Sequence, residues 1–310
     1  MDVTACICTH NRANYVRDCL EGLRQQTVGA DAFDILVVDS ASSGDVPAQL
    51  ERLVADIPNA RLLRVEQAGV SSARNAGACA AEGAYVAYID DDAIPAQDWI
   101  ASIQRAIGEN GRQPAMIGGR ILPHWEAPLP AWWPPKLRGT LSIIEYDGEG
   151  EFRTSALPAG MEPFGANMVV QVIPMLAIGG FGRRSGRFGK ALLSDEEVQL
   201  AWRLQSAGHS VRYDSRITVR HQIQAERLTP RWLLSRLYWQ GVSTVLTRRL
   251  LGQSGTVWRE LPRRLAVAML TAPFGLLPHR STRLLGCRWR LAYAAGFIRG
   301  ALGPPIATTG

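Results

Sequence analysis

The N-terminal part of the chain alternates short, continuously apolar segments with longer segments in which apolar residues recur at helical spacing. Such alternation predicts repeated strand–helix units, which connect by right-handed crossovers and form a mainly parallel sheet. We therefore predict an α/β fold, with a Rossmann-like, mainly parallel central sheet and helices on both of its faces. The predicted strands are residues 3–9, 33–40, 60–66 and 84–90, and the predicted helices are residues 12–27, 46–57, 71–83 and 99–107.

Polar clusters follow three of these predicted strands. They are Thr9–Arg12, Asp39–Asp45 and Asp90–Asp92. Ligands of open parallel sheets bind beyond the carboxyl ends of the strands, where all three clusters are expected to meet. One such cluster would be weak support for a binding site, but three on one rim predict one.

Asp90, Asp91 and Asp92 end an apolar strand, although adjacent carboxylates repel one another. Because successive strand side chains point to opposite faces, Asp90 and Asp92 are expected to share a side and Asp91 to turn away. Two carboxylates placed in this way suit Mg²⁺ or Mn²⁺, which retain substrate phosphates among their ligands. The alternative is a solvated acidic turn that caps the helix starting near Ala96.

Composition limits the class of protein. The 310 residues are 46% hydrophobic, and the five cysteines include no C-x-x-C pair. We therefore expect a folded core and a reducing compartment, with neither a disulfide framework nor structural zinc. The N-terminal residues do not resemble a signal peptide, so a cytoplasmic location is predicted.

The charge is divided unevenly along the chain. Residues 1–215 contain 19 Lys/Arg and 26 Asp/Glu, a net −7, whereas residues 216–310 contain 15 Arg and two Glu, a net +13. The basic part could approach an anionic surface, either nucleic acid or a layer of lipid headgroups.

A series of motifs follows the order found in one enzyme family. The segments are ICTHNR, ILVVDSASSGD, GVSSARNAG, YIDDDAIP, FGANM, GGFG, SDEEVQLAWRL and VRH. Across about residues 2–250 the chain resembles the family 2 glycosyltransferases, which have the GT-A fold and use nucleotide-diphosphate sugars. The resemblance implies a catalytic domain at residues 1–225 and a helical C-terminal extension at 226–310. The nucleotide-sugar half would be about residues 1–120 and the acceptor half about 121–225.

The resemblance also implies a set of donor-binding residues. Asp39 would accept hydrogen bonds from the base or ribose, or instead cap the following helix. The family often has an acid at the position of Gly44, whereas here the acid is Asp45. Arg74 would orient the diphosphate, or pair with nearby acids. The implied donor-binding residues are Thr9, Asn11, Arg12, Asp39, Ser42, Arg74, Asn75, Asp90 and Asp91.

The metal ligands implied by the resemblance are Asp92, Asp90 and His221, the last being either a ligand or a diphosphate contact. The cofactor would be Mn²⁺ or Mg²⁺. The resemblance also implies a catalytic base in the acids of SDEEVQLAWRL. We assign the base to Glu197, with Glu196 second and Asp195 third; the same acids would also stabilise a helix N-terminus.

Four residues are predicted to contact the sugar or the acceptor: Asn167, Trp125, Arg227 and Trp232. Trp125 lies with Trp132 and Trp133 in a Pro-rich segment that is predicted to be an extended loop. For these tryptophans, sugar stacking and ordinary packing both remain open. Arg227 and Trp232 belong to a predicted arginine- and tryptophan-containing helix at residues 226–242.

Residues 265–278 are uncharged and interrupted by Pro273, so they are too short to span a bilayer. We predict helices that lie in a membrane interface, with arginines at the headgroups. The alternative is a buried helical pair that packs on the catalytic domain or on a second subunit of a homo-oligomer.

Our leading hypothesis is an inverting, metal-dependent glycosyltransferase with a UDP sugar as the commonest donor type. Its acceptor would be a glycan or a lipid-linked molecule, it would act in the cytoplasm or at the cytoplasmic face of a membrane, and it would need no nucleic acid. A sugar-phosphate nucleotidyltransferase is one alternative, although ICTHNRANY lacks the expected glycine. A membrane- or nucleic-acid-binding module that uses the basic C-terminal region is the other.

Overall fold

The structure is a computed structural model that describes residues 2–108, 113–152, 161–182, 192–275 and 282–303. The chain divides into two compact units. The first comprises residues 1–124, 142–183 and 196–223, and the second comprises residues 125–141, 184–195 and 224–310. The predicted division into domains at residue 225 stays a prediction.

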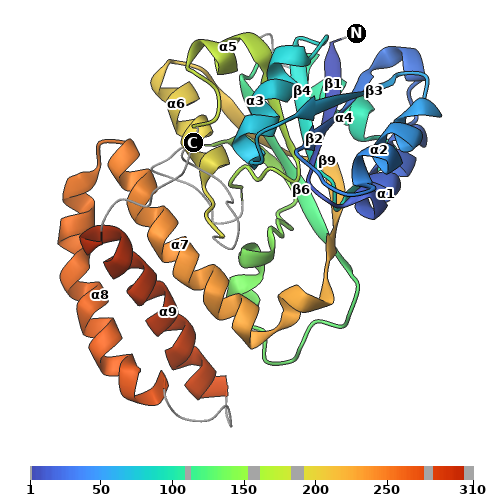
Figure 1. Ribbon diagram of the computed structural model, residues 1–310. Coiled ribbons are helices and arrows are strands. Elements are labelled where there is room, and N and C mark those ends of the chain that lie inside the picture. The colour runs from blue at the N-terminus through green and yellow to red at the C-terminus, as the bar shows by residue number, and fades with distance from the viewer. Residues whose placement is uncertain (1, 109–112, 153–160, 183–191, 276–281, 304–310) are drawn as a thin grey trace. The chain divides into compact units, whose positions relative to one another are not determined.

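The first unit is built on one sheet whose N-terminal half is parallel (Figure 1). Its strands are β1 (Val3–Thr9), β2 (Asp34–Ser40), β3 (Ala60–Val65) and β4 (Tyr85–Asp90). They lie in the order β3-β2-β1-β4, and each neighbouring pair is parallel. All four agree with the predicted strands to within one residue at either end.

The other half of the sheet is antiparallel and comes from later parts of the chain. Its strands are β8 (Met168–Gln171), β6 (Met116–Trp125), β9 (Val211–Ile223), β5 (Ala93–Pro95) and β7 (Glu149–Glu151). The order continues from β4 through β8, β6 and β9 to β5, and β7 also pairs with β9. β9 spans 13 residues and carries His221 near its C-terminal end.

Alternating residues of the parallel strands enter two separate apolar cores. Ile7, Val37 and Ile89 belong to one core, with buried residues of α1 (Ala13–Arg24), α2 (Val46–Ala55) and α4 (Trp99–Gly108). Cys6, Val38 and Tyr88 belong to the other, with residues of α3 (Val70–Ala80), α5 (Val172–Ala177) and α6 (Glu196–Ser206). Because both faces of the sheet are covered by helices, the predicted fold class is confirmed.

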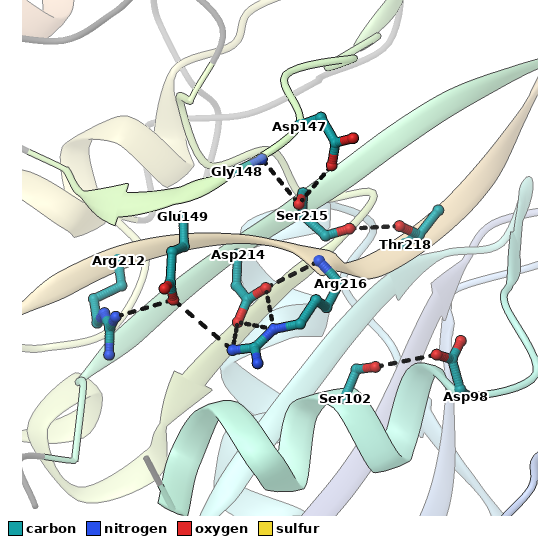
Figure 2. A network of polar contacts seen from close by, with 10 residues as sticks. All are labelled: Asp98, Ser102, Asp147, Gly148, Glu149, Arg212, Asp214, Ser215, Arg216 and Thr218. Carbon is teal, nitrogen blue, oxygen red and sulfur yellow. Dashed lines mark hydrogen bonds and ion pairs between the residues drawn. The ribbon is translucent and has the colours of Figure 1, made fainter. Parts of the chain in front are cut away.

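A network of charged residues joins β7 to β9 (Figure 2). Arg216 donates from Nε and Nη2 to the Asp214 carboxylate, at 3.0–3.1 and 2.6 Å. Glu149 lies 3.5 Å from Arg212 and 3.8 Å from Arg216. We call Glu149, Arg212, Asp214 and Arg216 the β7–β9 network; its two carboxylates face two guanidinium groups. These hydrogen bonds lower the pKa of Asp214, against the opposing effect of burial.

The second unit is mainly helical. It contains the 3₁₀ turns η2 (Pro135–Leu141) and η3 (Ala225–Leu228) and the helices α7 (Pro230–Leu250), α8 (Ser254–Gly275) and α9 (Thr282–Leu302). α9 packs against both α7 and α8. The approach of α7 to α9 depends on glycine, because a Cβ atom at Gly296 would overlap the carbonyl oxygen of Tyr238, and one at Gly241 that of Tyr293.

The predicted helix at residues 226–242 begins later than expected. Arg227 lies in the 3₁₀ turn η3, and α7 starts at Pro230. The Thr229 hydroxyl accepts a hydrogen bond from the backbone N–H of Trp232 at 3.2 Å, so Thr229 is the N-cap. Pro at the first helical position needs no hydrogen-bond acceptor, which explains why the helix begins there.

None of the helices in the described ranges is both long and apolar enough to cross a membrane.

Candidate active site

The carboxyl ends of three parallel strands bring the predicted polar clusters together. In the register of the sheet, Thr9 is the partner of Asp39, and Cys8 is the partner of Asp90. The register therefore places the ends of β1, β2 and β4 at one edge, as predicted from the order of the segments. All of the side chains that follow, up to Asn167, belong to the first unit.

Arg12 binds two of the three consecutive aspartates. Its Nη1 lies 2.7 Å from Asp91 Oδ1, and its Nη2 lies 2.8 Å from Asp92 Oδ2. Arg12 also stacks over the Tyr15 ring, with its guanidinium carbon 4.4 Å from the ring centroid. One guanidinium group therefore bridges two adjacent acids, which lowers the cost of placing them side by side.

The predicted alternation of the three aspartates is wrong in one respect. Asp91 was expected to turn away from Asp92, but both side chains reach Arg12. Asp90 instead faces Arg74 and is the most exposed of the three, with 39% of its side chain accessible. The reason is that β4 ends at Asp90, so Asp91 and Asp92 lie in a turn, where the alternation of a strand no longer applies.

Asp91 is a buried acid with a raised pKa. It is 4% exposed, and it accepts a hydrogen bond from the Thr9 hydroxyl at 2.7 Å. Burial raises the pKa of Asp91 to about 7, and the neighbouring Asp92 adds to the rise, while Arg12 and Thr9 oppose it. Asp91 therefore changes its charge close to neutral pH.

His221 meets Asp92 at the end of β9. The antiparallel pairing of β5 with β9 sets Ala93 opposite His221, one residue after Asp92. His221 Nε2 lies 3.3 Å from Asp92 Oδ1, and each side chain is 2% exposed. Residues 129 positions apart thus form one buried pair of metal-binding side-chain types.

This pair fits a magnesium or manganese site that substrate completes. No group of three or more His, Cys, Asp or Glu side chains in the described residues is arranged to hold a metal ion. Mg²⁺ and related ions, however, are often held by one or two carboxylates together with substrate phosphates. Asp92 and His221, with the more exposed Asp90 nearby in the chain, supply that type of incomplete donor set.

Arg74 joins the end of β4 to the start of α6. The side chain is 4% exposed, and its Nη1 lies 2.9 Å from Glu197 Oε1 and 3.5 Å from Glu196 Oε1. Its Nη2 lies 3.4 Å from Asp90 Oδ1. Burial by itself would lower the pKa of Arg74, but the neighbouring acids raise it by more. The net pKa of Arg74 is therefore raised, and the guanidinium stays charged.

Glu197 is anchored through one of its two carboxylate oxygens. Its Oε1 accepts hydrogen bonds from Arg74 and from the backbone N–H of Gly165, both at 2.9 Å. Its Oε2 has no hydrogen-bond partner among the described residues. A Cβ atom at position 165 would overlap the Arg74 guanidinium, so glycine is required for this approach. We call Asp90, Asp91, Asp92, Glu196 and Glu197, with Arg12 and Arg74, the acidic rim.

Asp39 and Asn11 organise the loops after β1 and β2. Asp39 is 1% exposed and accepts hydrogen bonds from the Ser42 backbone N–H at 2.9 Å and from Arg64 at 3.2 Å. Asn11 has a positive φ of 58°. Its N–H donates to Ser42 Oγ, and its side-chain oxygen accepts from the Ser43 N–H, both at 2.8 Å.

Asn75 and Asn167 make contacts typical of structural residues. Asn75 exchanges two hydrogen bonds with the backbone of Phe181, at 2.8 and 2.9 Å. Asn167 is fully buried, accepts from the Trp99 indole at 2.9 Å, and donates to the carbonyl oxygens of Arg120 and Ile217. These contacts favour packing roles, and ligand contact by either asparagine stays a prediction.

Four predicted site residues fall in the second unit: Asp195, Trp125, Arg227 and Trp232. Within that unit Gln240 donates to both Asp195 oxygens, at 2.9 and 3.1 Å. Trp125 lies under Arg138, and Trp232 packs on Trp133, with ring centroids 6.4 Å apart. These contacts favour ordinary packing for Trp133, which is 4% exposed. The acceptor roles stay predictions.

Arg64 was missed by the sequence reasoning. It donates to the Asp39 carboxylate and to the Ser42 carbonyl oxygen, at 3.2 and 3.1 Å. No motif marks it, because Arg64 lies within a strand and faces Asp39 only through the register of β2 and β3. Only the pairing register of those two strands could have identified Arg64.

Comparison with known proteins agrees with this geometry. Residues 4–136 match the family model for glycosyl transferase family 2. A glucosyl-dolichyl phosphate glucuronosyltransferase of Haloferax volcanii is 26% identical over 247 residues, which cover 78% of this chain and 76% of the relative. A pre-mycofactocin glycosyltransferase of Mycobacterium tuberculosis is 25% identical over 252 residues, covering 80% of this chain and 48% of the relative. The match thus spans about half of that second relative.

Solved structures show the same fold. The mannosyltransferase PcManGT from Pyrobaculum calidifontis, in complex with GDP-Man and Mn²⁺, has a TM-score of 0.61 at 15% identity and covers 97% of this chain and 87% of its own. TarS 1-349 of S. aureus, in complex with UDP-GlcNAc, has a TM-score of 0.52 at 12% identity and covers 96% and 91%.

The fold and the matched region define the chain as a glycosyltransferase with the GT-A fold. More narrowly, residues 4–136 match the family 2 glycosyltransferase model, which agrees with the resemblance of the motifs.

Proposed function

We propose that this glycosyltransferase transfers a sugar from a UDP sugar to a hydroxyl group of a lipid-linked or glycan acceptor, with inversion at the anomeric carbon. One observation carries the proposal. The buried Arg74 contacts both Asp90, at the predicted donor end, and Glu197, the predicted base. Arg74 therefore contacts both an acid expected to lie beside the donor and the acid expected to take the proton of the acceptor.

Glu197 is the base that the contacts support best. The acceptor hydroxyl must lose a proton as it attacks the anomeric carbon. Glu197 Oε1 is anchored by Arg74 and Gly165, which fixes the carboxylate and leaves Oε2 to receive that proton. Glu196 lies further from Arg74, at 3.5 Å, and is the second choice. Attack by the acceptor itself gives inversion.

Asp92, Asp90 and His221 are the proposed residues for Mn²⁺ or Mg²⁺. When bound, such a metal ion neutralises the charge that develops on the leaving diphosphate. Charge on the acidic rim supports this assignment, because five carboxylates there meet two arginines. Asp39, Arg64, Thr9 and the Asn11–Ser42 contact are proposed to shape the nucleoside pocket.

The relatives and neighbours support the substrate classes. The Haloferax relative is named for a dolichyl phosphate-linked substrate, which supports a lipid-linked acceptor here. Solved neighbours were determined with UDP, UDP-GlcNAc and GDP-Man, which supports a nucleotide-sugar donor. Attachment at the cytoplasmic face of a membrane through residues 226–310 is part of the same proposal.

A thermal-shift panel tests the donor class. The protein is melted with UDP, GDP, dTDP and CDP, each with and without Mn²⁺. We expect a rise in Tm for UDP that requires the metal, because the diphosphate completes the site. A rise for GDP alone would change the donor, and no rise with any nucleotide would contradict the proposal.

A further inference from the structure

α8 exposes large apolar side chains along much of its length. Met269 and Leu270 are 70% and 72% exposed, Trp258 is 54%, Phe274 is 46% and Leu265 is 39%. Leu265 and Met269 follow Trp258 by about two and three helical turns, so these three lie on one side of the helix. A single exposed leucine needs no explanation, but five large apolar residues on one helix indicate a binding surface.

A neighbouring side of α8, about 60–100° round the helix from Trp258, is already covered. Val257 and Leu261 are buried and belong to a core cluster with Val245 of α7 and Phe297 of α9. The helix therefore has apolar residues both on the side that α7 and α9 cover and on its exposed side. A helix with apolar residues on two sides is expected to contact a second apolar surface through its exposed side.

The charges beside this surface are positive. Arg259 and Arg263 are exposed on α8 and have no acidic partner among the described residues. The one acid of α8, Glu260, is bound by both Arg248 and Arg264. The arginines lie in the N-terminal half of the helix, and Met269, Leu270 and Phe274 lie in its C-terminal half.

We propose that the exposed side of α8 docks on an anionic lipid bilayer. Trp258, Leu265 and Met269 form one exposed stripe of the helix. Leu270 and Phe274 lie about two to four turns after Arg259 and Arg263, on a second exposed stripe beside the first. These five apolar side chains would enter the interface, and the two arginines would contact lipid phosphates. Helices with apolar side chains on one side and arginines beside them bind anionic membranes in this way.

Charge favours a bilayer over a second copy of the chain. Residues 216–310 carry 15 arginines and two glutamates, so two copies meeting through α8 would bring like charges together. Anionic headgroups neutralise the same arginines. The inference rests on the proposed function for its purpose, since a surface-bound enzyme meets a lipid-linked acceptor, but its test needs neither donor nor acceptor.

Vesicle sedimentation with the full chain tests the proposal. The vesicles are pure phosphatidylcholine or contain 30% phosphatidylglycerol. We expect binding to the anionic vesicles, and at least a tenfold weaker apparent affinity for the double variant Met269→Glu/Leu270→Glu. Both positions are exposed, so the variant should fold. The matched control is Ile173→Glu on α5, where the side chain is 79% exposed; this variant should bind like the parent protein.

A second variant isolates the charge. Arg259→Gln/Arg263→Gln should lose at least half of the preference for anionic over neutral vesicles, and 500 mM NaCl should have a similar effect on the parent protein. Unchanged binding by either double variant would overturn the proposal. Equal loss with Ile173→Glu would do so too, as would a dimer in light scattering that the glutamates dissociate without vesicle binding.

Failure of this inference and failure of the proposed function are separable. The thermal-shift panel with nucleotides is run in solution without lipid, and the glutamate variant should respond to UDP and Mn²⁺ as the parent does. Vesicle binding without any nucleotide response would contradict the proposed function alone. A nucleotide response without vesicle binding would contradict the docking surface and the proposed membrane attachment, but not the proposed sugar transfer.

Discussion

The acidic rim and the β7–β9 network are both made of carboxylates and arginines in the first unit, yet they differ in charge balance. The β7–β9 network pairs Asp214 and Glu149 with Arg212 and Arg216 (Figure 2). The acidic rim sets five acids against Arg12 and Arg74. A balanced network holds strands together, whereas a surplus of buried negative charge suits a cationic ligand.

The two regions also differ in how the chain assembles them. Asp214 and Arg216 are two residues apart on one strand, so any folded β9 brings them near each other. Arg74 and Glu197 are 123 residues apart and meet only when α3 and α6 pack on the sheet. Perturbed charges gathered from distant segments are more typical of functional sites than of surface ion pairs.

The largest effect is expected at the proposed base. Glu197→Gln should lower kcat about 1000-fold, because the amide retains the contact with Gly165 but cannot accept the acceptor's proton. The measurement is nucleotide release in the presence of acceptor. Nucleotide binding in a thermal-shift assay should persist, and Asp214→Asn in the β7–β9 network should leave kcat unchanged. Full activity in Glu197→Gln would move the base to Glu196.

The next largest effect is expected at the metal-binding acid. Asp92→Asn should weaken Mn²⁺-dependent binding of UDP about 100-fold, because a neutral amide replaces a charged oxygen ligand. Calorimetric titration of UDP with and without Mn²⁺ measures this. Binding that keeps its metal dependence in the variant would show that Asp92 is not a ligand.

Arg12 provides a test of stability. Arg12→Met should lower the free energy of unfolding at pH 8 by about 2 kcal/mol, because it leaves Asp91 and Asp92 without their shared cation. Arg216→Met is the matched change in the β7–β9 network. Arg212 also lowers the pKa of Asp214 and remains in this variant, so the loss of Arg216 should cost less than about 1 kcal/mol. Urea unfolding compares them, and equal losses would contradict the difference between the two regions.

The smallest effect is a pH dependence. Burial raises the pKa of Asp91 to about 7, so between pH 4 and 7 the folded protein binds a proton that the unfolded chain releases. Its contribution to stability is therefore lost as pH rises through 7, by about 1 kcal/mol between pH 6 and pH 8. Asp91→Asn should flatten the dependence of the unfolding free energy on pH over that range.

Asp214 provides a contrast of opposite sign. Its pKa is lowered by Arg216, so its contribution is present at neutral pH and is lost as pH falls through the acidic range. Asp214→Asn should therefore leave the slope between pH 6 and pH 8 unchanged. A flattened slope in this variant, or none in Asp91→Asn, would contradict the assignment to Asp91.

Much of the parallel half of the sheet was predictable from the sequence. Continuous apolar runs such as Val3–Thr9 are buried on both faces, and this pattern depends only on local composition. The edge at which Thr9, Asp39 and Asp90 meet followed from chain direction alone. The start of α7 at Pro230 rather than at residue 226 was also predictable from the local sequence, because Thr229 and Pro230 suit an N-cap and a first helical residue. The helix-favouring composition of the whole segment obscured this signal.

The contacts within the site were less predictable. The order of the motifs assigned Asp90, Asp92, Glu197 and His221 to one site. It did not indicate that Asp91 and Asp92 would both bind Arg12. That arrangement depends on where β4 stops. The role of Arg64 depends on the register of two strands, which has no signature in either strand taken alone.

The sequence by itself determined the strand–helix order, the rim on which acids gather and the family model that residues 4–136 match, because these depend on local patterns and on segment order. Only the tertiary structure decided which acid meets which arginine, and which side of α8 remains uncovered. Those outcomes depend on packing between segments far apart in the chain, where a shift of one residue exchanges a buried side chain for an exposed one.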